Sequence, residues 1–278
     1  MTFRASPTKL SLFRQCRRRY RYEYVDRLGP TFKRPRPHLV MGAHVHEALR
    51  LLYARVRPER RSAEVAERIL RRSWRRGRVG FASEEEERSF GQRAVAMIRR
   101  FCALTDLRVD PLATEQMHEA ALEPDLVLVG RVDRVNAQSD GTARVVDYKT
   151  GRRRGADEDR SAQEWQAAIY AHLVESVLGR RVTRVEMFYL TDGVKETIRA
   201  DASSRKGTLE AVRAQVREIE RERDFSPSPG PLCAYCDYLR ICDAGRDFVA
   251  RRAAAGLSGR PADPAPRGSR RRDEDEGS

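Results

Sequence analysis

The sequence has no apolar run of the roughly 20 residues needed to cross a bilayer, and no signal-type apolar segment follows Met1. Its five cysteines are an odd number for a disulfide framework and are unevenly spread, so metal ligation is the predicted use. No internal repeat is present, and the sequence has no Gly-x4-Gly-Lys-Ser/Thr phosphate loop. These absences predict a soluble cytoplasmic protein without a membrane span.

Positive charge dominates the composition. The 278 residues include 55 Lys and Arg against 41 Asp and Glu, which gives a net charge of +14. A surplus of this size favours a polyanionic partner, although an arginine-rich proteome encoded by a high-GC genome would produce the same surplus. The length suits one elaborated domain with a sizeable core better than two small domains.

Residues 145–151 begin with two valines, and a carboxylate and an amine follow two positions apart. Val145 and Val146 favour a strand, so Asp147 and Lys149 project from the same face. Residues 126–135 form a second strand-like run, separated from the first by a turn-rich segment, as in a β-hairpin. Such a hairpin can bring Asp133 beside Asp147.

Two carboxylates at short range repel each other unless a cation lies between them, and an oxygen-lined site suits Mg²⁺ or Mn²⁺. Lys149 could orient or deprotonate an attacking water while the metal stabilises charge on a phosphate. This combination predicts phosphodiester cleavage. The alternative is that Asp147 and Lys149 form an exposed ion pair at a strand end.

The flanking segments alternate between helical and strand patterns. Ser6 and Pro7 predict a helix start, and the apolar stripe that follows includes Cys16. The arginines around the stripe could contact a phosphate backbone or form a merely solvated face: Arg14, Arg17, Arg18, Arg19 and Arg21. Further helices are predicted over residues 42–53, 63–76, 84–107, 161–178 and 209–223, and strands over residues 115–122, 182–190 and 194–200.

The C-terminal part contains a compact cysteine motif. Cys233, Cys236 and Cys242 follow the spacing Cys-x2-Cys-x5-Cys, and one more sulfur would complete a tetrahedral or cubane site. Cys16 is the natural fourth ligand. Cys102, between apolar neighbours in a predicted helix, has the pattern of a buried structural thiol.

Taken together, these residues resemble the RecB-like branch of the PD-(D/E)xK nucleases, in particular members with an iron–sulfur cluster such as AddB-type helicase-nucleases and CRISPR spacer-acquisition nucleases. The resemblance spans about residues 6 to 245. The family motifs occur here in order: a G-x-x-x-H helix at 42–46, a G-x-x-D strand at 130–133, D-x-K at 147–149, Q-x-x-x-Y at 166–170, and the split cysteine set.

The resemblance implies a restriction-endonuclease-like α/β fold, a mixed sheet flanked by helices. We expect one nuclease domain over residues 1–253, with a helical region at about 38–110 inserted before the sheet, and a disordered charged tail over residues 254–278. It also assigns roles: His46, Asp133 and Asp147 bind the divalent metal, Lys149 serves the water or the scissile phosphate, and Gln166 and Tyr170 orient the DNA or the site. Glu115, on the strand before Asp133, is a looser assignment as an assisting residue, whereas His44 does not match the motif.

For the cysteines, the resemblance implies a [4Fe–4S] cluster held by Cys16, Cys233, Cys236 and Cys242, with Zn²⁺ as the alternative. The expected activity is that of an Mg²⁺- or Mn²⁺-dependent DNA nuclease, an exonuclease acting on single-stranded DNA in repair or recombination. The alternative is a non-cutting iron–sulfur module that binds DNA for a helicase or a CRISPR adaptation partner.

Overall fold

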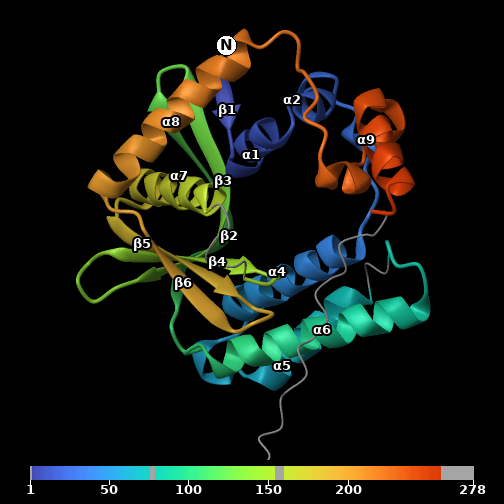
Figure 1. Cartoon of the computed structure of the whole chain (residues 1–278). Coiled ribbons are helices and arrows are strands. Elements are labelled where there is room, and N and C mark those ends of the chain that lie inside the picture. Colours follow the sequence, from blue (N-terminus) through green and yellow to red (C-terminus); the bar gives the residue numbers. More distant parts are fainter. Residues whose placement is uncertain (1, 76–78, 154–159, 258–278) are drawn as a thin grey trace, which may run out of the picture.

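The computed structural model describes residues 2–75, 79–153 and 160–257. A six-stranded mixed sheet lies at its centre, with helices on both faces (Figure 1). The strands are β1 (Phe3–Ala5), β2 (Pro111–Glu123), β3 (Leu126–Ala137), β4 (Ala143–Lys149), β5 (Val182–Tyr189) and β6 (Val194–Arg199). The predicted α/β class with a mixed, helix-flanked sheet is confirmed.

The sheet combines an antiparallel meander with a parallel crossover. Strands β2, β3 and β4 pair antiparallel in sequence order, as the strand-like runs separated by turn residues predicted. The chain then crosses through α7 (Ser161–Leu178) to β5, which pairs parallel with β4, and returns antiparallel in β6. β1 adds to β3 in parallel orientation. The sheet order is β1-β3-β4-β5-β6, with β2 also paired to β3.

Two hydrophobic cores lie on opposite faces of the sheet. One face packs against α1 (Pro7–Gln15), α7 and α8 (Ala202–Arg221), and the other against α4 (Pro37–Arg55), α5 (Ala63–Trp74) and α6 (Glu84–Ala103) (Figure 1). Alternation along β4 serves both cores, because Val145 enters the first and Val146 and Tyr148 enter the second. Asp147 and Lys149 therefore share the face that carries α7.

The first predicted helix is interrupted at Cys16. Its N-terminus is as expected, with Ser6 accepting a hydrogen bond from the Lys9 amide. Cys16 itself is extended, with φ −165° and ψ 111°, and the chain resumes as α2 (Arg17–Tyr20) and a π-helical turn over Arg21–Val25. The prediction of one continuous stripe through Cys16 was therefore wrong. The break turns Cys16 away from the core side chains and toward the C-terminal segment.

The C-terminal segment lies against the N-terminal one. Two 3₁₀ turns, Pro231–Tyr235 and Leu239–Ile241, lead into α9 (Asp243–Ala254), which the sequence did not predict. α9 lies close to α2 in Figure 1, and the Tyr22 hydroxyl donates a 3.2 Å hydrogen bond to the Ile241 carbonyl. Two short helical turns complete the described elements: α3 (Gly29–Phe32) and a 3₁₀ turn over Pro58–Arg60.

Most of the predicted tail, from residue 258 onward, lies outside the described residues. Among the helices that are described, none combines the length and the apolar character needed to cross a membrane.

Candidate active site

The two predicted acidic residues lie where two strands separate. β3 and β4 pair from Ala137↔Ala143 as far as Arg134↔Val146, and their pairing stops there. Asp133 and Asp147 are the next residues on each strand, and only 7% and 3% of their surfaces are exposed. The fork between the strands therefore holds both carboxylates at nearly dry positions.

One group of potential ligands gathers on the Asp133 side of the fork. α4 places His46 Nδ1 2.8 Å from Glu115 Oε1 and 3.4 Å from Asp133 Oδ1. Within the described ranges, these three residues are the only group of three or more His, Cys, Asp or Glu ligand atoms that all lie within 4.8 Å of one another. Imidazole nitrogen and carboxylate oxygen are donors that Mn²⁺ accepts, and oxygens suit Mg²⁺.

A chain of polar contacts continues on the Asp147 side. Lys149 Nζ lies 2.6 Å from Asp147 Oδ2 and donates to Gln166 Oε1 at 2.6 Å. Gln166 Nε2 in turn lies 3.0 Å from Asp147 Oδ1 and 2.9 Å from the Tyr170 hydroxyl. One turn of α7 separates Gln166 from Tyr170, so both reach the same side of the sheet. The structure thus brings together the D-x-K and Q-x-x-x-Y residues.

The acidic surroundings shift the titration of the basic groups. Burial opposes a charged ring at His46, but the hydrogen bonds and charges of Asp133 and Glu115 raise its pKa to about 10. Burial likewise opposes a charged ammonium, and Asp147 overcomes it and raises the pKa of Lys149. Burial and the charge of Asp147 raise the pKa of Asp133 to about 6. Lys149 is therefore a cationic donor, which favours orienting water or phosphate over deprotonating water.

Close backbone approach fixes the position of α4 over the end of β4. A Cβ atom at Gly42 would lie 3.0 Å from Thr150 Oγ1, directly after the D-x-K residues. The glycine therefore lets the helix that carries His46 reach the strand that carries Asp147. His44 is directed elsewhere, since its Nδ1 lies 2.8 Å from Ser73 Oγ and its ring packs against Trp74.

A second candidate site lies between the two ends of the chain. A cavity of about 150 Å³ is lined by all four predicted cluster ligands: Cys16, Cys233, Cys236 and Cys242. Two backbone amides donate to the sulfurs, from Ser228 to Cys16 Sγ at 3.5 Å and from Gly230 to Cys233 Sγ at 3.4 Å. Such N–H···S contacts favour thiolate ligands. Cys102 lies away from this cavity, in α6.

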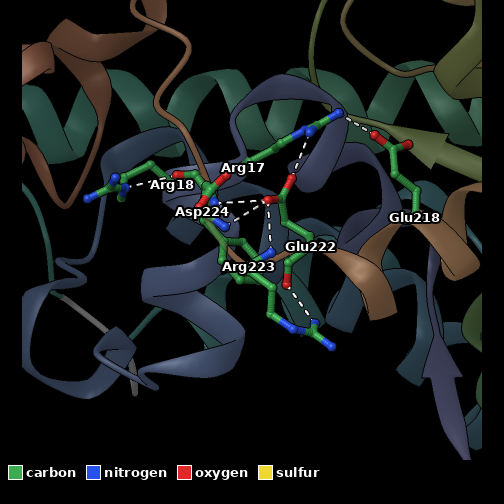
Figure 2. Close-up of polar contacts among 7 residues, drawn as sticks. Arg17, Arg18, Glu218, Glu222, Arg223 and Asp224 are labelled. Atoms are coloured by element: carbon green, nitrogen blue, oxygen red, sulfur yellow. Dashed lines mark hydrogen bonds and ion pairs between the residues drawn. The ribbon is translucent and has the colours of Figure 1, made fainter.

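Two arginines that the sequence suggested for phosphate contact are engaged within the protein (Figure 2). Arg17 contacts Glu218 and, at 2.6 Å, Glu222, and Arg18 Nε donates to the Phe225 carbonyl at 2.9 Å. They connect α2 to the end of α8 and the connector after it. Arg131, by contrast, is exposed on β3 two residues before Asp133 and thus faces the same side of the strand.

Comparison with known proteins agrees with this geometry. Residues 4–243 match the family model of the PD-(D/E)XK nuclease superfamily. A solved structure described as "Putative exonuclease" from Eubacterium rectale is 14% identical to this chain. The alignment covers 86% of this chain and 88% of that one, and the TM-score of 0.53 shows a similar fold. A second structure, of SSO0001, is 15% identical over 87% of this chain and 86% of that one, with a TM-score of 0.40. No curated protein matches the sequence. Because the family match covers most of its length, the chain belongs to the PD-(D/E)XK nuclease superfamily.

Proposed function

We propose that this protein is a divalent-metal-dependent deoxyribonuclease, an exonuclease that hydrolyses single-stranded DNA in repair or recombination. The observation that carries the proposal is the joining of Asp133, Asp147 and Lys149 at one fork of the sheet, in a chain that belongs to a nuclease superfamily. The structural neighbour described as "Putative exonuclease" has a similar fold, and its description supports the exonuclease assignment. DNA as the partner agrees with the net charge of +14.

The proposed roles follow from the donors at each position. His46, Asp133 and Asp147 would hold Mg²⁺ or Mn²⁺, which when bound supplies Lewis acidity toward the phosphate and the attacking water. Lys149, as a cationic donor, would orient that water or a non-bridging phosphate oxygen. Gln166 would keep Lys149 and Asp147 in place, because it contacts both, and Tyr170 would fix Gln166.

We further propose that the four cysteines hold a [4Fe–4S] cluster that links the N-terminal and C-terminal segments of one domain over residues 1–253. All four cysteines line one cavity of about 150 Å³, so one metal centre could contact them all. The preference for iron over zinc rests on the resemblance to iron–sulfur nucleases. A helicase or CRISPR adaptation partner stays a prediction.

The test is degradation of end-labelled oligonucleotides by the purified protein with Mg²⁺, Mn²⁺ or EDTA. Single strands and duplexes, each blocked at the 5′ or the 3′ end, would define strand preference and polarity. We expect metal-dependent shortening of single strands from a free end, and no activity of Asp147→Asn purified in parallel. DNA that is bound but left intact with either metal would favour the non-cutting binding module, and equal activity of Asp147→Asn would show that a contaminant cuts.

A further inference from the structure

We propose that Glu115 is an additional ligand of the divalent-metal site, aimed at that site by a left-handed backbone conformation within β2. This inference rests on the proposed function and extends the predicted ligand set of His46, Asp133 and Asp147 by one carboxylate.

The backbone at Glu115 departs from an ordinary strand. Its neighbours pair regularly across the sheet, Thr114 with Arg134 and Gln116 with Val132, which places Glu115 opposite Asp133. Yet Glu115 has φ +48°, in the region that side-chain-bearing residues rarely occupy. This conformation costs stability in any residue other than glycine, and the surrounding strand must hold it.

The conformation delivers the carboxylate to the proposed metal position. Glu115 Oε1 lies 2.8 Å from His46 Nδ1, closer than the 3.4 Å between that nitrogen and Asp133 Oδ1. The side chains of Glu115 and Asp133 are 7% and 8% exposed, so water solvates neither well. His46 Nδ1 contacts both carboxylates, and the ligand atoms of these three residues all lie within 4.8 Å of one another.

The balance of charges at the site also supports Glu115 as a ligand. Lys149 and one divalent ion bring three positive charges, and a metal-ligating His46 must be neutral. Asp133 and Asp147 supply two negative charges, and Glu115 supplies the third. With Glu115 as a ligand the buried site is neutral when loaded, whereas without it one positive charge would be left uncompensated in a poorly solvated position.

Mn²⁺ binding by the full chain provides the test, measured by the electron paramagnetic resonance signal of free Mn²⁺ and by calorimetry. Glu115→Gln keeps the size of the side chain but removes its charge, and we expect at least tenfold weaker Mn²⁺ binding. Glu119→Gln, on the same strand, removes a carboxylate that pairs with Arg4 at the surface, and it should bind as the unmodified protein does. Glu115→Gly should also bind Mn²⁺ weakly, while its metal-free form melts at a higher temperature because glycine tolerates the left-handed conformation.

Each outcome bears on a different claim. If Glu115→Gln binds Mn²⁺ as tightly as the unmodified protein, Glu115 is not a ligand and the inference is wrong, whereas the proposed function stands. If the unmodified protein binds no Mn²⁺ at millimolar concentration, the proposed metal-dependent function falls and the inference falls with it. A lower melting temperature for metal-free Glu115→Gly would contradict the role of backbone strain.

Discussion

The carboxylate of Asp133 accepts a 2.6 Å hydrogen bond from the backbone amide of Tyr148, the residue between Asp147 and Lys149. One acidic residue of the fork is thus anchored to the main chain that carries the other. A shift of either strand would move both carboxylates, so the distance between them is fixed by backbone rather than by side-chain packing alone.

Substitutions of Asp133 should separate this anchoring role from chemistry. Asp133→Ala leaves the buried Tyr148 amide without an acceptor, a loss of about 1–3 kcal/mol in the free energy of unfolding. Asp133→Asn keeps an acceptor oxygen and should be clearly more stable than Asp133→Ala in urea titrations, while both variants lose metal-dependent cleavage. Equal destabilisation by the two substitutions would argue that the hydrogen bond contributes little.

Lys149→Gln should lower turnover without weakening metal binding. Loss of one electrostatic donor lowers the cleavage rate by about 10²- to 10⁴-fold. Removal of a cation that contacts Asp147 should at the same time leave divalent-ion affinity intact or raise it, because the ammonium no longer competes for that carboxylate. Cleavage of labelled single strands and Mn²⁺ titration give the two values. An unchanged cleavage rate would mean that Lys149 takes no part in the reaction.

Gly42→Ala tests the approach of α4 to β4. Alanine normally stabilises a helix interior by about 1 kcal/mol relative to glycine. At Gly42 the new Cβ would meet Thr150 Oγ1 at 3.0 Å, whereas at Gly207 in α8 nothing lies within 4 Å. We expect Gly207→Ala to raise the melting temperature and Gly42→Ala to gain less or lose, with lower nuclease activity. The double variant Gly42→Ala/Thr150→Ser leaves the hydroxyl and should not rescue, whereas Gly42→Ala/Thr150→Ala should.

Arg131 should contribute to DNA binding, and Arg17 should contribute to the stability of the fold. Arg131→Gln is expected to weaken single-stranded DNA binding and to reduce the slope of log affinity against log salt by about 0.7, the value for one phosphate contact. Arg17→Gln should lower the melting temperature instead, since Arg17 holds Glu218 and Glu222. Fluorescence anisotropy over a salt series and thermal melts would distinguish them. If the salt dependence of DNA affinity changes only in Arg17→Gln, the arginines around Arg17 contact the DNA and Arg131 does not.

The cysteines should fall into two chemical classes. Protein prepared without oxygen is expected to be brown, and Cys16→Ala should remove the colour and lower stability, whereas Cys102→Ala should keep the colour. Burial raises the pKa of Cys102 to about 11, so at pH 8 it is a thiol and reacts slowly with iodoacetamide. Its labelling rate should increase as pH rises toward that pKa. Zinc without iron in anaerobic protein would contradict the cluster.

The local elements of the sheet could be predicted, and the long-range ones could not. Strands β3 and β4 are rich in β-branched residues and are separated by a short turn-rich segment, so the hairpin that places Asp133 near Asp147 is encoded locally. The three-residue β1 pairs with a distant strand, and no local pattern specifies it. The extended conformation of Cys16 interrupts a helical pattern and the left-handed one of Glu115 lies within a strand, and no local pattern specifies either.

The contacts of the basic residues could not be predicted from the sequence either. An arginine-rich helix has one composition whether its guanidinium groups meet DNA or glutamates more than two hundred positions away in the chain. Only the fold brings Arg17 to Glu222, and the sequence patterns around Arg17 carry no information about that partner.

The position of Cys16 near the start of the chain and of its three companions near the end also sets an order of events during synthesis. The N-terminal thiol emerges from the ribosome first and must wait, reduced and unligated, until almost all of the domain has been translated. Insertion of a cluster would then be a late step that only chains translated beyond Cys242 can complete. The absorbance of the cluster would then measure the fraction of chains in which translation had passed Cys242 and Cys16 had come together with the three C-terminal cysteines.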